Sequence, residues 1–143
     1  PYIAMHMQGT PQTMQDDPKY GFAPIEVFDV LARHVDRLVA AGLPRSHIAV
    51  DPGFGFGKTL QHNLAMLSDL ASFQALQKPI LVGISRKSML GEITGRSVAE
   101  RLPASLAAAL VAVQHGANIL RVHDVGATRD ALAVWTALEY SSA

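Results

Sequence analysis

The sequence contains no cysteine, no long apolar run and no net charge. Without cysteine the chain has neither a disulfide framework nor a zinc–thiolate site, and this composition suits a reducing cytoplasm. No apolar stretch approaches the roughly 20 residues that cross a bilayer. Lys plus Arg and Asp plus Glu each count 12, so nothing favours a nucleic-acid backbone as a ligand. We therefore expect a cytoplasmic protein whose partners are neither membranes nor nucleic acids.

An alternation of apolar segments indicates repeated β–α units. The chain is 49% hydrophobic, which argues against disorder. Strands are expected at 2–7, 48–51, 79–84 and 118–122, and helices at about 24–41, 61–73, 102–115 and 128–140. Residues 8–23 and 85–99 are expected to be loops, with Thr128 as the N-cap of the last helix. Four such units in one domain, 1–143, predict a parallel sheet covered by helices.

Polar side chains follow each of the four predicted strands. They are His6, Gln8, Asp51, Ser85, Arg86, Lys87, Ser88, Arg121, His123 and Asp124. Ligands bind at the carboxyl ends of strands in both β/α barrels and open parallel sheets. Any one of these residues could instead be a helix cap or a solvated loop residue, but the set as a whole predicts a binding site.

The glycine-rich segment 51–59 does not fit either common nucleotide-binding motif. A Walker A loop needs a glycine where Pro52 stands, and a dinucleotide fingerprint needs a glycine spacing that residues 53–57 do not have. What remains is flexible backbone beside two aromatic rings. We expect Phe56 to close over a flat ring; the alternative, which is stronger for Phe54, is a side chain packed inward.

Asp51 opens this segment at a predicted strand end. A carboxylate there can accept two hydrogen bonds from an amidine-like edge, such as that of a 2-amino-pyrimidinone. Met5 could line the same flat-ring site. The alternative for Asp51 is to cap the following helix, a role that Thr59 could also fill.

The cations near the third and fourth strand ends suit an anionic ligand. Lys87 is a point charge between two serines, whereas an exposed loop position is favoured for Arg86. Arg121 and His123 alternate along a strand and therefore share one face. They could hold a diphosphate and neutralise it as it leaves. The alternative is a structural pair of either residue with Asp124.

Four motifs in this order resemble the later signatures of dihydropteroate synthase. They are MHMQG at 5–9, DPGFGFGK at 51–58, GISRKS at 83–88 and RVHDV at 121–125, with SLAAA at 105–109 and HGA at 115–117 resembling its penultimate helix. The resemblance implies a TIM barrel and a transferase of folate biosynthesis. That enzyme joins p-aminobenzoate to 6-hydroxymethyl-7,8-dihydropterin diphosphate and releases diphosphate, with Mg²⁺ as cofactor. Its p-aminobenzoate pocket is also the sulfonamide pocket.

The resemblance also implies roles for individual residues. The pterin would be bound by Asp51, Met5, Phe56, Gly83, Lys87 and Arg121. The p-aminobenzoate would be bound by Ser85, Ser88, Phe56 and Lys87, and the diphosphate by Arg121 and His123. Catalytic roles would fall to Lys87, Arg121 and His123.

The length of the chain corresponds to part of such a barrel. A (β/α)₈ barrel usually takes about 250 residues, and this chain has 143 residues and about four of the eight units. By the resemblance it is the C-terminal half, and the protein ligand of Mg²⁺ is expected in the N-terminal half. We expect little or no synthase activity from the chain alone, and a homodimer or swapped oligomer, because sheet edges would be unpaired. A methyltetrahydrofolate-type pterin-binding methyltransferase domain and a non-catalytic half-domain are the alternatives.

Overall fold

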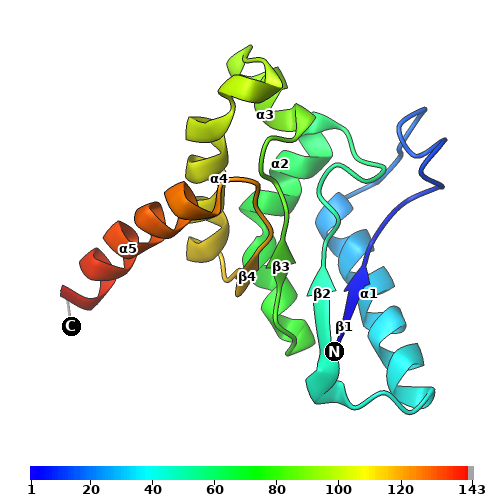
Figure 1. Ribbon diagram of the computed structural model, residues 1–143. Helices are drawn as coiled ribbons and strands as arrows, with labels where there is room; N and C mark the ends of the chain where they lie inside the picture. Colours follow the sequence, from blue (N-terminus) through cyan, green and yellow to red (C-terminus); the bar gives the residue numbers. More distant parts are fainter. Residues whose placement is uncertain (142–143) are drawn as a thin grey trace.

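The computed structural model describes residues 1–141, in which four strands alternate with helices (Figure 1). The strands are β1 (Tyr2–Met5), β2 (Ile48–Asp51), β3 (Leu81–Val82) and β4 (Ile119–Leu120). The α-helices are α1 (Ala23–Ala40), α2 (Leu60–Ser68), α3 (Ser88–Thr94), α4 (Leu102–Gln114) and α5 (Val125–Ser141). The short 3-10 helices are η1 (Arg45–His47), η2 (Leu70–Leu76) and η3 (Val98–Glu100).

The strands lie side by side in the order in which they occur in the chain. β1 pairs with β2 and β3 pairs with β4, both in parallel. A parallel bridge between Val50 and Ile80 joins the two pairs, and the Val50 amide donates to the carbonyl of Pro79 at 2.9 Å. Sequential parallel strands with helical crossovers are what one half of a β/α barrel contains. The predicted parallel βα units are therefore confirmed.

The last two strands are shorter than predicted. Only two residues of each form a regular ladder, although single hydrogen bonds continue beyond them. The Arg121 amide donates to Val82 O at 2.9 Å, and the Asn118 side chain accepts from the Ile80 amide at 2.9 Å. A run of apolar residues indicates that a segment is buried, but burial alone does not determine how many of its residues pair with the neighbouring strand.

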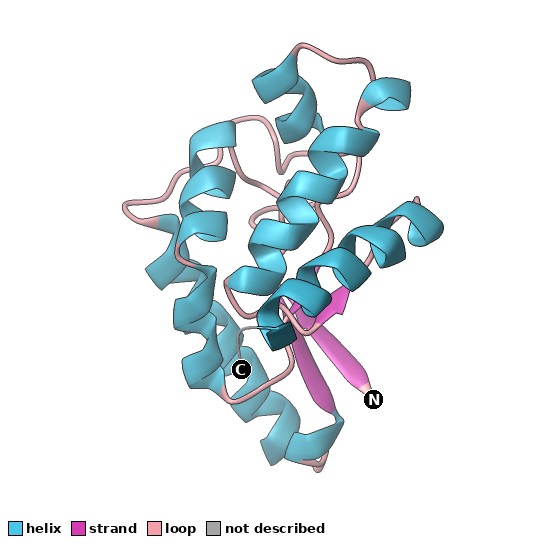
Figure 2. Cartoon of the chain, turned by 90° about the vertical axis from the view of Figure 1, so that its left-hand side faces the viewer, coloured by secondary structure: helices cyan, strands magenta, loops and turns pink. Residues whose placement is uncertain are grey.

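Helices cover one face of the strands (Figures 1 and 2). The core between helices and strands holds buried apolar side chains from β1, β2 and β3, from α1 to α4 and from η2. They include Ala4, Val27, Leu31, Val35, Ile48, Val50, Met66, Leu70, Phe73, Ile80 and Val82. Burial of this surface is the main favourable term in folding, and it fixes the helices behind the strands. None of the helices within residues 1–141 is long and apolar enough to cross a membrane.

Residues 85–99, predicted to be a loop, contain α3 and η3. Met89 and Leu90 are buried against the core, which gives this short polar segment an apolar anchor. Gly95 ends α3 in the left-handed conformation, with φ of 70°. Only these two of the apolar residues in the segment are buried, and so short an apolar run is too weak a pattern to predict a helix from sequence.

Two helix boundaries also differ from the prediction. α5 begins at Val125, so Thr128 lies inside the helix and is not its N-cap. The Thr128 hydroxyl donates instead to the carbonyl of Asp124 at 2.9 Å. The helix predicted over 61–73 ends at Ser68 and is followed by η2.

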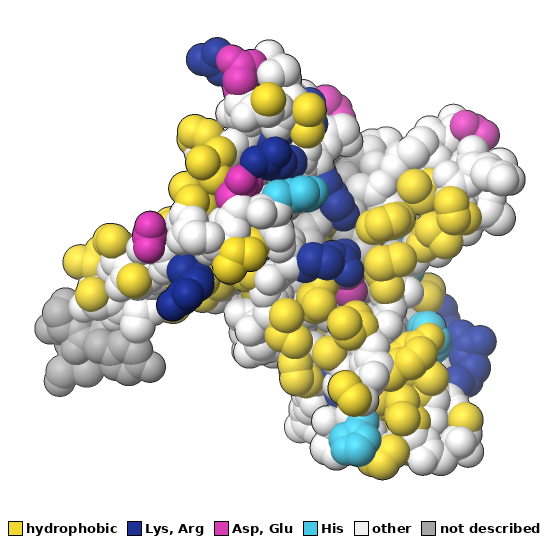
Figure 3. Space-filling view, in the orientation of Figure 1, with side chains coloured by type: hydrophobic (Ala, Val, Ile, Leu, Met, Phe, Trp, Pro, Cys, Tyr) yellow, Lys and Arg dark blue, Asp and Glu magenta, His cyan; other side chains and the backbone are white. Residues whose placement is uncertain are grey.

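The face of the strands turned toward the viewer in Figure 1 is not covered by a helix within the described residues. Apolar side chains are visible over the strands in the space-filling view (Figure 3). Tyr2 and Ile3 of β1 are 44% and 46% exposed, and Ile119 of β4 is 40% exposed. The outer strands therefore carry apolar side chains that residues 1–141 bury only in part.

Candidate functional site

Asp51 lies at the centre of the polar cluster at the strand ends. The residue is only 1% exposed and stands opposite Met5 in the β1–β2 register. Its Oδ1 accepts from the Gly53 amide at 2.8 Å, and its Oδ2 accepts from Arg121 Nη2 at 3.0 Å. Thr59 caps α2 in a capping box with His62, so the capping alternative for Asp51 is wrong. The carboxylate is thus held in place with lone pairs to spare for a ligand.

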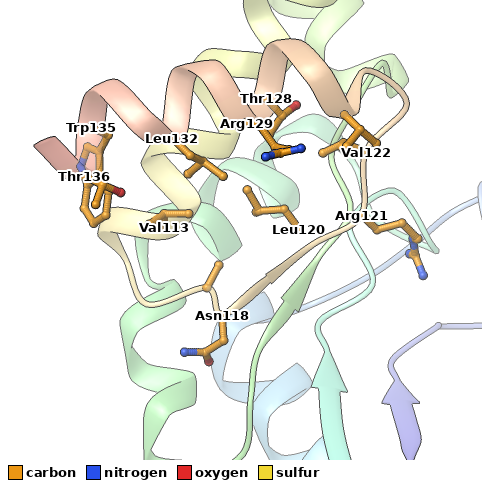
Figure 4. Close-up of a pocket in the computed structure, with 12 residues that line it drawn as sticks. Val113, Asn118, Leu120, Arg121, Val122, Thr128, Arg129, Leu132, Trp135 and Thr136 are labelled. Atoms are coloured by element: carbon orange, nitrogen blue, oxygen red, sulfur yellow. The ribbon is translucent and has the colours of Figure 1, made fainter.

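Arg121 reaches from the end of β4 across β3 to β2. A Cβ atom at Gly83 would lie 2.9 Å from Arg121 Nη2 and 3.0 Å from its Nε, so the guanidinium passes directly over this glycine. Figure 4 shows the side chain directed away from α5 and toward β2. The Arg121 side chain remains 53% exposed, so it can meet both Asp51 and a ligand.

Each carbonyl of residues 53–57 accepts a hydrogen bond from a side chain. The donors, in chain order of the carbonyls, are Lys58 for Gly53, Lys87 for Phe54, Gln15 for Gly55, Lys58 for Phe56 and Tyr20 for Gly57. The Gly55 amide donates to Asn63 Oδ1 at 2.8 Å. We call residues 53–57 the glycine loop. Hydrogen bonds from side chains of several segments hold this loop, which is not part of a strand.

The two aromatic rings of the glycine loop differ in burial. Phe54 is fully buried, as its alternative reading predicted. Phe56 is half-buried, and Lys87 Nζ lies 4.5 Å from the centre of its ring. Burial lowers the pKa of Lys87 to about 8, with Asp51 opposing that shift and Arg121 adding to it. Lys87 therefore keeps most of its charge at neutral pH.

Lys58 and His6 form a buried pair whose importance the sequence did not reveal. Lys58 Nζ lies 2.9 Å from His6 Nδ1, 2.9 Å from Gly53 O and 3.1 Å from Phe56 O. Burial lowers the pKa of Lys58 to about 7, and burial together with the charge of Lys58 lowers the pKa of His6 to about 4. The sequence placed His6 at a strand end and Lys58 at the close of the glycine-rich motif, but it did not indicate that the two side chains meet.

The ends of β3 and β4 are joined by two polar pairs. His123 donates its amide to Ser85 Oγ at 3.2 Å, and its Nδ1 lies 3.0 Å from the same hydroxyl. Arg86 binds Asp124 through two hydrogen bonds, of 2.9 and 2.5 Å, which lowers the pKa of the carboxyl. The exposed-loop interpretation of Arg86 is therefore wrong. Asp124 does form a structural pair, but with Arg86 rather than with Arg121 or His123.

The structure thus groups the predicted residues unequally. One group lies around Asp51 and consists of Asp51, Met5, Phe56, Gly83, Lys87 and Arg121. Ser85 is buried beneath His123, whereas Ser88 is exposed at the first position of α3. Figure 3 shows basic side chains gathered on this part of the surface.

A separate cavity of about 630 Å³ lies between α4, β4 and α5 (Figure 4). Leu120, Leu132 and Trp135 point into it, and Arg121 is the one predicted site residue on its rim. Because none of the other predicted site residues lines it, this cavity is not the predicted site. Within residues 1–141 no group of three or more His, Asp or Glu side chains is placed to hold a metal ion.

The fold and this cluster place the chain in a known class. The chain belongs to the family described as "Pterin binding enzyme", whose profile matches residues 1–123. Dihydropteroate synthase of Haemophilus influenzae is 46% identical over 137 residues, which are 96% of this chain and 50% of that protein. The chain spans about half the length of the curated relatives it matches.

Solved structures of similar proteins agree. Yersinia pestis dihydropteroate synthase in a sulfonamide drug complex is 40% identical, with a TM-score of 0.94, over 97% of this chain and 51% of that one. Burkholderia cenocepacia dihydropteroate synthase complexed with 7,8-dihydropteroate is 48% identical, with a TM-score of 0.89, over 98% of this chain and 53% of that one. The four βα units are therefore about half of a TIM barrel, as predicted. These names do not support the methyltransferase alternative.

Proposed function

We propose that this chain supplies the substrate-binding strand ends of a dihydropteroate synthase. The reaction condenses 6-hydroxymethyl-7,8-dihydropterin diphosphate with p-aminobenzoate and releases diphosphate. The observation that carries the proposal is the buried Asp51 carboxylate, bonded to Arg121 and flanked by the Lys87–Phe56 pair. The similar proteins bound to a sulfonamide and to 7,8-dihydropteroate support it.

The pterin half of the site is assigned to the strand ends around Asp51. Its two oxygens have one protein partner each and can accept further hydrogen bonds from the amino and ring N–H groups of a pterin edge. Arg121 lies over Gly83, so its planar guanidinium is placed to lie against a flat ring. Met5, next to Asp51 in the register, lines the same slot.

The p-aminobenzoate half is assigned to the rim of the glycine loop. Phe56 is the half-buried ring, and Lys87 lies over it with its charge largely intact at neutral pH. Ser88 is exposed at the first position of α3, where its hydroxyl is free to reach a carboxylate. Ser85, which accepts a hydrogen bond from His123, acts beneath this subsite rather than in it.

The chemical step breaks the bond between the pterin methylene carbon and the diphosphate oxygen. Diphosphate leaves with the electron pair, the amine nitrogen of p-aminobenzoate bonds to the methylene carbon, and the amine then loses a proton. Arg121 and His123 neutralise the negative charge that develops on the leaving group. The bonds from His123 to Ser85 fix the imidazole at the end of β4. Little general-base help is needed, because a neutral aromatic amine is already nucleophilic.

Mg²⁺ belongs to the proposal only as part of the whole enzyme. The described residues offer no cluster of carboxylates or imidazoles that fits a metal. No step is assigned to the ion through this chain. Since the chain spans half of its relatives, we expect little or no turnover from it alone.

The test is a diphosphate-release assay with and without an added N-terminal half from a relative. We expect release only when both halves are present. Asp51→Asn should abolish it, because the amide presents a donor to the donors of the pterin. Asp36→Asn, at an exposed ion pair with Arg45, is the matched control and should retain it. Equal release from the Asp51 variant would contradict the proposal.

A further inference from the structure

Lys58 is a buried cation to which the proposed reaction gives no role. The residue is 3% exposed and stands at the end of the glycine loop. An ammonium group has three protons and no lone pair. Its three partners, His6 Nδ1, Gly53 O and Phe56 O, lie between 2.9 and 3.1 Å away. Each proton therefore has one acceptor.

This arrangement determines the state of the imidazole. While Lys58 is charged, His6 Nδ1 must offer a lone pair, so the ring proton is on Nε2. His6 is 5% exposed, and the lowering of its pKa to about 4 agrees with a neutral ring. The segment after β1 is pressed against the loop, since a Cβ at Gly53 would lie 1.9 Å from His6 O.

The same ammonium sets the direction of the loop carbonyls. Lys58 donates hydrogen bonds to the carbonyls of Gly53 and Phe56. Lys87 donates to the carbonyl of Phe54, which lies between them, and its ammonium lies over the Phe56 ring. The two lysines hold the loop through different groups. Release of the Gly53 and Phe56 carbonyls would free the backbone that positions the partners of Lys87.

We propose that Lys58, together with His6, is a positioning residue that holds the glycine loop in the conformation on which Lys87 is seated. That this serves the p-aminobenzoate half of the site rests on the proposed function. The positioning itself does not, and it is tested without substrate.

The Lys58–His6 pair also keeps the glycine loop in this conformation when Lys58 loses a proton. A neutral amine retains two N–H groups for the two carbonyls and gains a lone pair, which His6 can meet by moving its proton to Nδ1. The other titratable groups facing the pair are Asp51, Lys87 and the ring of Tyr20. Asp51 opposes the lowering of the Lys58 pKa and Lys87 adds to it. Titration of Lys58 thus changes the tautomer of His6, while the glycine loop keeps its conformation.

The first experiment measures amide hydrogen exchange across the chain in Lys58→Met. We expect the amides of Gly53, Gly55 and Phe56 to exchange at least about tenfold faster, because hydrogen bonds from a charged donor are among the stronger ones. Lys78→Met is the matched control: that lysine also donates to a carbonyl, of Arg45, and its loss should leave the loop unchanged. Unchanged loop exchange in a folded Lys58→Met protein would overturn the proposal.

The second experiment needs no variant and covers the case in which Lys58→Met does not fold. Nitrogen-15 NMR of the imidazole reports which ring nitrogen of His6 carries the proton. We expect a proton on Nε2 near pH 6 and on Nδ1 once Lys58 is neutral, with loop protection maintained. A proton on Nδ1 at pH 6, or one tautomer throughout the titration of Lys58, would contradict the pairing.

Discussion

Arg121 Nη2 and Asp51 Oδ2, 70 positions apart in the chain, are joined by a 3.0 Å hydrogen bond across the end of β3. The bond crosses above Gly83, the position at which a side chain would collide with the guanidinium. It gives a buried carboxylate a charged partner and places that partner where a ligand can reach it. We therefore expect a ligand that binds Asp51 to contact Arg121 as well.

Removal of Arg121 should destabilise the fold measurably, because it takes the charged partner from a buried carboxylate. In Arg121→Ala, Asp51 keeps its bond from the Gly53 amide but loses the charged one. We expect the free energy of unfolding to fall by about 1–2 kcal/mol, because the arginine is half exposed and its ion pair is partly screened. Urea denaturation measures this value. Arg33→Ala, at an exposed position of α1, should change it by less than about 0.5 kcal/mol, and equal losses would contradict a special role for the Arg121–Asp51 bond.

A methyl group at Gly53 should be far more damaging than one at Gly42. Both glycines have positive φ, 72° and 95°, so both substitutions carry backbone strain of about 1–2 kcal/mol. At Gly53 the added Cβ would also lie 1.9 Å from His6 O, whereas at Gly42 nothing lies within 4 Å. Gly53→Ala should therefore cost about 3 kcal/mol or more in the free energy of unfolding. Similar thermal melting of the two variants would show that the loop is not packed against His6.

Acid should destabilise the protein through His6. Its pKa is about 4 in the folded state and 6.5 ordinarily, so the unfolded chain binds the extra proton first. The contribution to stability is complete above pH 6.5 and is lost as the pH falls toward 4, on the order of 3 kcal/mol. His6→Gln, which keeps an acceptor for Lys58, should show a smaller loss of stability between pH 7 and pH 4.5. Parallel curves for the two proteins would assign the acid effect to other groups.

The clustering of Asp51 and Arg121 could be predicted from the sequence because strand ends are easy to recognise. Asp51 and Arg121 each follow an apolar run, and parallel strands bring their carboxyl ends to one edge. The prediction that such residues meet needs no knowledge of side-chain direction. The motif resemblance then agreed with the family that the comparisons show.

The contacts that hold the site together could not be predicted in the same way. Lys58 pairs with His6, which lies on the segment after β1. Arg86 pairs with Asp124, which lies 38 positions further along the chain. Such pairs depend on how segments distant in sequence pack, which periodicity does not encode. Arg86 also has φ of 59°, a conformation that its residue type gives no reason to expect. The helix α3 was missed because its apolar anchor is only two residues long.

Self-association of the chain should depend on its outer strands. Ile3 of β1 is 46% exposed beside unpaired backbone, which favours contact with another chain. We expect sedimentation velocity to show association that increases with protein concentration and is reduced by Ile3→Lys. Ile25→Lys, at an exposed position of α1, is the matched control and should leave association unchanged. A monomer at all concentrations would contradict this expectation.

The central claim is that Asp51 and its neighbours form a pterin site within this chain. Calorimetric titration of the chain with the pterin diphosphate tests it most directly, with Asp51→Asn and Asp36→Asn alongside. We expect measurable binding that is lost in Asp51→Asn and kept in Asp36→Asn. Absence of binding by a chain that melts cooperatively, or binding unaffected at Asp51, would contradict it.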